Sequence, residues 1–448
     1  MLTKAQYLVR LQESVQLSNR EKGPHIYKSD SADDLSPFRS LPNELLSRIF
    51  VLCSEFNIRV FYRRYRIPHQ ITISQVCSRW RQVALGTGAL WSSIEVTRFD
   101  TEYTRRLSLY QMLIGRAGDY PLTVSLYAYS SRLDIYKVFL DFVVPFRIKK
   151  LDITMYHKLS DLPSLLNVEE FAISNLKDED LNSSAFMDKT RHISIWHFAE
   201  ECEPKLKQAC LSWHRLRSFE CDSGAVPLST WLDVLRQGTL QYLEQLWLTI
   251  SNIGTGPLVG VCIPNLRWLS LSLLNMQPSI IIPLIAAPNI TTLEISSYHN
   301  NWSSDTYDII KRHYKLHQLH HIRLCNKGFP LCIAQILADA PIIHTLEVLG
   351  KPILDTGSRE GIASGRIGSC LTTLNIGNCF DTAGEWLDMI ERRQKNVKLM
   401  AIEVSNWREM FTGVKLVGLW NVPSGSEEYY KERVVALEAL GTTVVFAP

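Results

Sequence analysis

A small helical module is predicted by LPNELLSRIFVLC, residues 41–53, together with ITISQVCSRWRQVALGTGALWSSIEV, residues 71–96. Ser40 can cap a helix that begins near Pro42, because a proline at the first helical position loses an amide that would be unpaired anyway. Apolar residues follow helical spacing in both stretches, which predicts two amphipathic helices. They are Leu45, Leu46, Ile49, Phe50 and Leu52, then Ile73, Val76, Cys77, Trp80, Val83 and Ala84. Two such helices are too small to bury this surface alone, so we expect a partner to cover part of it.

These residues resemble an F-box, the motif that docks substrate receptors onto the Skp adaptor of cullin-based ubiquitin ligases. The opening Leu-Pro, the first helix, the VCxxWR signature and the closing Leu-Trp all have counterparts. The resemblance implies that the adaptor contacts Leu41, Pro42, Glu44, Leu45, Ile49, Phe50, Val76, Cys77, Trp80 and Trp91. Residues 54–70 are an insertion longer than a minimal F-box has, although a long insertion costs little closure entropy. The alternative is an ordinary helical hairpin packed on its own domain.

Length and composition limit the possible architecture and cellular location of the protein. A chain of 448 residues exceeds one ordinary core, so several domains or a repeat array are expected. The amino terminus lacks the apolar core of a secretory signal, and the apolar run at 280–288 is too short to span a bilayer. The ten cysteines form no CxxC pair, so no disulfide framework is expected. We therefore expect a soluble protein, cytoplasmic and/or nuclear, without a membrane partner.

A short pattern, apolar-x-x-apolar-x-apolar, repeats along most of the chain. Copies begin at residues 148, 168, 190, 216, 243, 266, 290, 319, 343, 371 and 399, and SSIEV at 92 and LTVSLY at 122 resemble two earlier copies. Short alternating segments at this spacing are typical of a solenoid. Each strand is expected to lead into a helix, for example in TGPLVGVC after residue 250 or PLCIAQILADA at 330–340. Parallel strands would then line one face and helices the other.

The repeats resemble irregular leucine-rich repeats of the kind that often follows an F-box. LTTLNIGNC carries Cys379 at the ninth position, where that family favours Asn or Cys, although most copies carry a large apolar residue there. The resemblance implies an α/β fold with an N-terminal three-helix F-box, followed by a right-handed, leucine-rich-repeat-like α/β solenoid with a parallel sheet. We predict an N-terminal helix and linker at 1–35, the F-box at 36–97 and the solenoid at 98–448. The combination is most similar to F-box proteins abundant in mushroom-forming fungi.

Positions 3, 5 and 7 of each copy should point to the open face, because side chains alternate along a strand. The acids there are Asp152, Glu170, Glu220, Asp222, Glu294, Glu347 and Glu403, against the bases Lys150 and Arg323. Trp247 and Trp268, in adjacent copies, are predicted to form one aromatic platform. The predicted target-binding residues are Trp196, Trp247, Trp268, Glu294, Arg323 and Glu347, and the expected partner has a basic surface. The alternative is that the rings lie flat over neighbouring strands and the acids are merely solvated.

Other clusters favour structural interpretations. RVFYRRYR at 59–66 mixes arginine with aromatic residues, as some nucleic-acid sites do, but a solvated loop or a contact with an acidic adaptor surface is simpler, so no nucleic-acid partner is predicted. His313, His317, His320 and His321 have no accompanying ligand at a recognised spacing, so no metal is predicted. HExxH, GxSxG and GxxxxGK are all missing from the sequence, so we expect neither an enzyme nor a cofactor.

The sequence therefore predicts the substrate receptor of a cullin-based ubiquitin ligase. The F-box would hold a Skp-type adaptor and through it a cullin, and the solenoid would hold a target protein. Ubiquitin transfer would occur on other subunits, so this chain would act by proximity. The competing interpretation is a non-catalytic interaction scaffold that works without cullin recruitment.

Overall fold

The computed structural model divides into two compact units, Met1–Ile49 and Phe50–Pro448. It describes residues 41–53, 58–59, 68–97, 103–127, 139, 141–143, 145–154, 168–176, 190–198, 215–224, 226–237, 240–297, 302–353, 355–377, 385, 387–395, 432–433, 435–437 and 439. The predicted N-terminal helix and linker at 1–35, the Ser40 cap, Glu403 and the copy at 399 lie outside these residues, as does all but the first residue of the basic segment 59–66.

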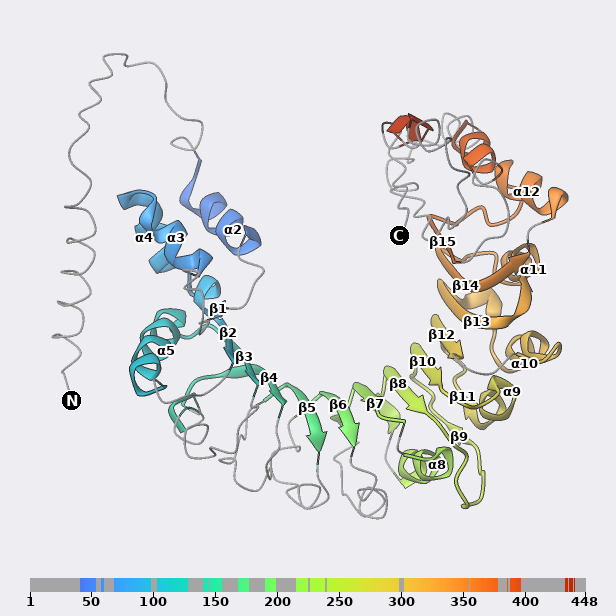
Figure 1. The fold of residues 1–448 in the computed structure, drawn as a ribbon, viewed down its shortest axis with the longest axis horizontal. Helices are drawn as coiled ribbons and strands as arrows, with labels where there is room; N and C mark the ends of the chain where they lie inside the picture. Colours follow the sequence, from blue (N-terminus) through green and yellow to red (C-terminus); the bar gives the residue numbers. More distant parts are fainter. Residues whose placement is uncertain are drawn as a thin grey trace. The chain divides into compact units, whose positions relative to one another are not determined.

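Three helices form the predicted helical module within the described residues (Figure 1). Helix α2 spans Asn43–Cys53, and its first turn closes on the Pro42 carbonyl, which accepts from the Leu45 and Leu46 amides at 3.1 Å each. The apolar spacing alone indicated one helix in the second stretch, which forms α3 (His69–Gln75) and α4 (Ser78–Gly86). With α2, these are the three helices that the F-box resemblance implied. Cys77 causes the break because its backbone is extended, and its sulfur caps α4 by accepting from the Trp80 amide at 3.4 Å.

Aromatic side chains hold this helical region of the second unit together. Phe50 of α2 packs against Trp80 of α4 with ring centroids 4.9 Å apart. Trp91, in the 3-10 turn η2 (Gly88–Trp91), is fully buried, and its indole nitrogen donates to the Ala84 carbonyl at 2.8 Å. The Arg116 guanidinium, from helix α5 (Tyr103–Ala117), lies 4.6 Å from the Trp91 ring centroid. Trp91 thus ties α4 to the start of the sheet region.

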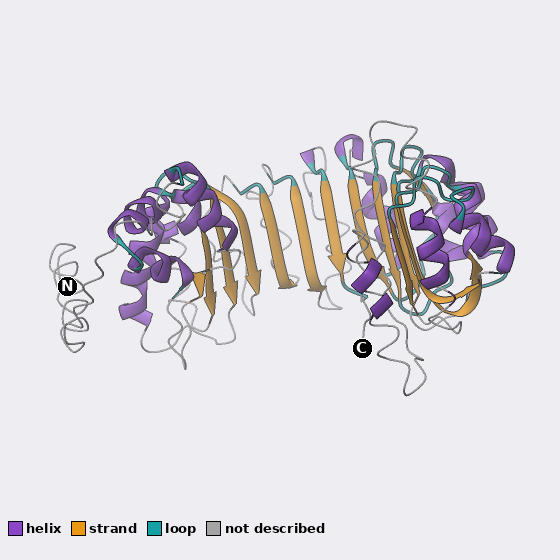
Figure 2. Cartoon of the chain, turned by 90° about the horizontal axis from the view of Figure 1, so that it is seen from above, coloured by secondary structure: helices purple, strands orange, loops and turns teal. Residues whose placement is uncertain are grey.

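The described strands form a 13-stranded sheet in which every neighbouring pair is parallel and the strands follow chain order (Figure 2). Their bounds are β1 Ile58–Arg59, β2 Ser93–Thr97, β3 Leu122–Tyr127, β4 Ile148–Thr154, β5 Glu170–Leu176, β6 His192–Phe198, β7 Ser218–Asp222, β8 Gln245–Ile250, β10 Trp268–Leu273, β12 Thr292–Ser297, β13 His321–Cys332, β14 Thr345–Ile353 and β15 Thr373–Gly377. The copies predicted from residue 92 to residue 371 all fall on strands, so the predicted parallel sheet is confirmed.

Helices between the strands lie along one side of the sheet (Figure 1). They are α5, α8 (Leu228–Gln237), α9 (Pro278–Ile281), α10 (Thr306–His313), α11 (Ile333–Asp339) and α12 (Thr356–Ala363), with 3-10 turns η8 (Leu240–Tyr242), η9 (Ile282–Leu284) and η10 (Leu316–Gln318). This arrangement confirms the predicted α/β fold class. The helix expected in PLCIAQILADA is α11.

The prediction of a helix in TGPLVGVC was wrong. Residues 251–260 are irregular, and the chain then forms β9 (Val261–Cys262), which pairs with β11 (Ile285–Ala286) in a separate two-stranded sheet. The preceding Gly254 has φ of +78°, and a Cβ there would lie 2.4 Å from the Ser229 hydroxyl oxygen. Only glycine fits such a position easily, so the loop packs closely against α8 and does not wind into a helix.

One row of buried side chains runs through the sheet from strand to strand. Its members stand opposite one another in register and are at most 3% exposed: Ile94, Val124, Leu151, Phe171, Ile193, Phe219, Leu246, Leu269, Leu293, Ile322, Leu346 and Leu374. The row faces the helices, since Phe219 packs against Trp231 of α8 at a centroid distance of 5.6 Å. Truncating such a buried leucine to alanine costs about 2–5 kcal/mol.

The C-terminal part of the described chain is held by two arginines. The Arg393 guanidinium is buried and donates to the carbonyls of Ile362, Gly368 and Leu371 at 2.7, 2.6 and 3.3 Å. Burial lowers the pKa of Arg393 to about 10, so it stays charged at neutral pH. Arg433 pairs with Asp388 and Glu391 at 2.6 and 2.8 Å, which joins the last described residues to the segment 387–395.

We predict that the C-terminal segment caps the end of the sheet region. A chain ending at Gly425 loses Arg433 and the buried Leu437, and losing one buried leucine already costs about 2–5 kcal/mol. Its melting temperature should therefore fall, and it should be less soluble. Circular dichroism melts of the truncated and full chains measure this. Val435→Ser, at an exposed position in the same segment, should melt like the parent. Equal melting of the truncated and full chains would rule the cap out.

Candidate binding sites

Helix α2 buries one apolar face and leaves another exposed. Leu46 and Phe50 are buried, whereas Leu45, Ile49 and Leu52 are 44%, 37% and 67% exposed. Positions four and three residues apart lie on one face of a helix, so the exposed side chains form a single apolar stripe. Among the other predicted adaptor contacts in this segment, Pro42 and Glu44 are exposed and Leu41 is half-buried. Leu52 was not among the predicted contacts, although its spacing could have identified it.

The turn between α3 and α4 exposes a second apolar group. Val76 is 58% exposed and Cys77 is exposed, whereas Trp80 is half-buried. Phe50 and Trp91 have almost no exposed surface, so of the ten predicted adaptor contacts these two can act only by holding the helices in place. Fewer side chains are therefore exposed for adaptor contact than the ten that the motif predicts.

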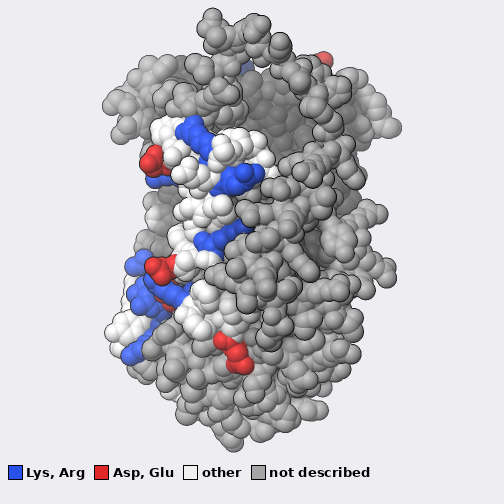
Figure 3. Space-filling view, turned by 90° about the vertical axis from the view of Figure 1, so that its left-hand side faces the viewer, with Lys and Arg blue, Asp and Glu red and all other residues white. Residues whose placement is uncertain are grey.

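Basic side chains accompany these apolar groups. Residues 41–53 and 68–91 contain Arg48, Arg79 and Arg81 but a single acid, Glu44. Figure 3, which looks onto the side of Figure 1 where these helices lie, shows Lys and Arg side chains among uncharged ones, together with some Asp and Glu side chains. Such a surface favours an acidic partner, because complementary charge steers association.

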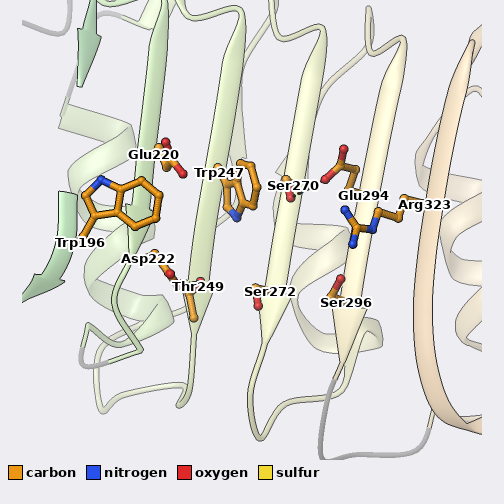
Figure 4. Close-up of a pocket in the computed structure, with 10 residues that line it drawn as sticks. All are labelled: Trp196, Glu220, Asp222, Trp247, Thr249, Ser270, Ser272, Glu294, Ser296 and Arg323. Atoms are coloured by element: carbon orange, nitrogen blue, oxygen red, sulfur yellow. Dashed lines mark hydrogen bonds between the residues drawn. The ribbon is translucent and has the colours of Figure 1, made fainter. Parts of the chain in front are cut away.

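A cavity of about 190 Å³ lies on the side of the sheet that the helices leave open (Figure 4). Strands β6 to β8 contribute Trp196, Glu220, Asp222, Trp247 and Thr249. Strands β10 to β13 contribute Ser270, Ser272, Glu294, Ser296 and Arg323. Serines on β10 and β12 occupy little space where neighbouring strands carry tryptophan or arginine, and this contrast creates the hollow.

Two exposed tryptophans stand on either side of β7. Trp196 and Trp247 are each 38% exposed; Trp196 stands opposite Asp222 on β7, and Trp247 stands opposite Glu220. Trp268, which was expected to form a platform with Trp247, stands opposite Gln245 instead and does not line the cavity. In-register pairing explains the difference, because Trp268 is at the third position of its copy and Trp247 at the fifth.

The two carboxylates of β7 are fixed by hydroxyl groups and lack basic partners. Glu220 accepts from the Ser194 hydroxyl and Asp222 from the Thr249 hydroxyl, each at 2.8 Å. Within the described part of the chain, neither carboxylate has an ion-pair partner. Each retains a second oxygen for a ligand, so this end of the cavity carries uncompensated negative charge.

The acids toward β14 are partly compensated within the protein. Glu294 is only 7% exposed; it accepts from the Ser270 hydroxyl at 3.1 Å, and the His321 ring lies 3.7 Å away. Glu347 lies 3.7 Å from the Arg323 Nε and accepts from the Asn375 amide at 3.2 Å. The Arg323 Nε is within ion-pair range but makes no hydrogen bond. Arg323 stands between Glu294 and Glu347 in register, so it offsets part of the negative charge that the sequence predicts here.

The acidic side chains nearer to β2 are also partly compensated. Burial raises the pKa of Asp152; Lys150 opposes this shift and Glu95 adds to it. Glu170 lies 3.5 Å from the Lys149 ammonium. Of the acids predicted on this face, Glu220 and Asp222 are therefore the ones best placed to meet an external cation.

Other kinds of site have little support. Among the described residues, no group of three or more His, Cys, Asp or Glu side chains could hold a metal ion. Of the clustered histidines, His320 stacks on His344 with ring centroids 5.2 Å apart. No helix in the described ranges is long and apolar enough to cross a membrane.

Comparison with known families identifies the first region. Residues 38–97 match the F-box-like family, and no curated protein matches the chain. The matched residues include α2, α3, α4 and the exposed apolar groups Leu45, Ile49 and Val76. The chain therefore carries an F-box-like domain at residues 38–97, followed by a long α/β region built on a parallel sheet.

Proposed function

We propose that this chain is the substrate-recognition subunit of a cullin-based ubiquitin ligase. Its F-box-like domain docks onto a Skp-type adaptor, and residues 98–448 form a leucine-rich-repeat-like solenoid that holds a target protein. The observation that carries the proposal is the exposure of Leu45, Ile49, Leu52 and Val76 within the segment that matches the F-box-like family. The combination of an F-box with irregular leucine-rich-like repeats resembles the F-box proteins abundant in mushroom-forming fungi, and we place the chain in that group on this resemblance.

Adaptor binding follows from the chemistry of these exposed groups. Burying a Leu, Ile or Val side chain contributes about 1.5–3 kcal/mol, so a few anchors suffice for stable docking after the cost of association. Arg48, Arg79 and Arg81 add attraction toward an acidic adaptor surface. Phe50 and Trp91 contribute indirectly by keeping the helices in place.

A substrate receptor of this kind needs no catalytic residues of its own. A receptor that holds its target beside a ubiquitin-loaded subunit raises the effective concentration of the reacting groups. The sheet face, with its cavity and exposed tryptophans, is the surface we assign to the target. The predicted target-binding residues Trp196, Trp247, Trp268, Glu294, Arg323 and Glu347 all lie on that face.

Removing two surface anchors tests the docking. We expect Pro42→Ala combined with Leu45→Ala to weaken adaptor binding by about a thousandfold, because two interface anchors can each contribute 2 kcal/mol or more. Biolayer interferometry with purified adaptor measures the loss. The matched control is Tyr242→Ala with Leu258→Ala, two exposed positions in the sheet region. Undiminished capture of the adaptor by the first variant would refute the docking surface.

A second pair of variants distinguishes a side chain that contacts the adaptor from one that only holds the helices in place. Val76→Ser removes an exposed apolar group, so adaptor affinity should fall while the melting temperature stays unchanged. Phe50→Ala removes a buried ring and should lower both, since truncating a buried aromatic costs about 3–5 kcal/mol. Melting curves and adaptor titrations of both variants measure this. Wild-type affinity in Val76→Ser would remove Val76 from the interface.

A further inference from the structure

We propose that the cavity on the sheet face binds one cationic side chain, Lys or Arg, from an extended segment of the target. This inference rests on the proposed function, in which the sheet face receives the target. The cation would sit between Trp196 and Trp247, with Glu220 and Asp222 as its counter-charges (Figure 4).

The two indole rings flank the space where the cation would sit. They stand on β6 and β8, so the single strand β7 lies between them. Adjacent strands are about 4.8 Å apart, which separates the β6 and β8 backbones by about 10 Å. Trp196 stands two positions further along its strand than Trp247, which adds an offset of about 7 Å that a long cationic side chain can span. A cation between these rings would contact aromatic surface on both sides, and each such contact attracts it.

The carboxylates of β7 give this part of the cavity a negative charge. Glu220 and Asp222 alternate with the buried Cys221 on β7, so both carboxylates point to the open face. Figure 4 shows them between the two rings. Each is oriented by one hydroxyl, from Ser194 or Thr249, and neither has an ion-pair partner within the described residues. A neutral or anionic side chain would leave these charges uncompensated.

The rest of the cavity is shaped to receive a peptide backbone. Ser270, Ser272 and Ser296 form a low polar floor beside Trp247, where a peptide backbone can lie close to the sheet and exchange hydrogen bonds with hydroxyl groups. Arg323 closes the far end, so a second cation would be repelled there. The cavity thus favours one cationic side chain followed by small or acidic residues toward β13.

A selection from random peptides tests the proposal even before the target is identified. Displayed peptides are enriched on the full chain in low salt, and affinities of the enriched peptides are measured by fluorescence anisotropy. We expect a shared Lys or Arg, and replacing it by norleucine should weaken binding by about tenfold or more. Affinity should also fall as salt rises.

Matched variants assign the binding to this cavity. Glu220→Gln with Asp222→Asn keeps the side-chain shapes and should weaken the enriched peptides about tenfold or more, as should Trp247→Ala. Glu347→Gln is the control, because that acid already faces Arg323, and it should change affinity less than about twofold. Arginine, lysine and trimethyl-lysine versions of one peptide then show which cation is preferred.

Three outcomes would overturn the proposal: no enrichment, enriched peptides without a common Lys or Arg, or peptides whose affinity is unchanged in Glu220→Gln with Asp222→Asn. The variant Pro42→Ala with Leu45→Ala should bind the peptides like the parent. Loss of adaptor binding and loss of peptide binding are therefore separate results, and either proposal can fail without the other.

Discussion

In-register pairing of parallel strands is the constraint on which the sheet region depends. Every strand of the 13-stranded sheet from β2 to β15 places a buried apolar residue directly beside the equivalent residue of its neighbour in the sheet. Side chains alternate along a strand, so burying Leu246 and Leu248 forces Trp247 onto the open face. A slip of one residue would exchange the two faces and bury charged groups. The core thus fixes the position of every residue that lines the cavity.

The helical module follows a different rule, because its short helices cannot bury all of their apolar groups. Leu46 and Phe50 are buried, while Leu45, Ile49 and Leu52 of the same helix remain exposed. An exposed stripe of this kind is costly for an isolated protein and useful for one with a permanent partner. The two regions therefore present surfaces of different chemistry: apolar groups with basic neighbours on the helices, and tryptophans with uncompensated acids on the sheet.

The local sequence pattern was enough to predict the strands, since their spacing recurs and the apolar positions of each copy are the buried ones. Local pattern failed where contacts with other segments of the chain determine the structure. The break at Cys77 depends on a cap to Trp80, and Gly254 stops a helix because it packs against Ser229. The pairing of Trp196 and Trp247 around β7, and the compensation of Glu347 by Arg323, depend on strand register and cross-strand contacts. No single copy of the repeat contains that information.

We propose that one chain links a target-binding sheet to a cullin through the adaptor. The most direct measurement is the mass of the complex that the full chain forms with a Skp-type adaptor and a cullin, by size-exclusion chromatography with light scattering. We expect one complex containing one copy of each protein. A stable complex with the adaptor that excludes the cullin would contradict the ligase function and favour an interaction scaffold.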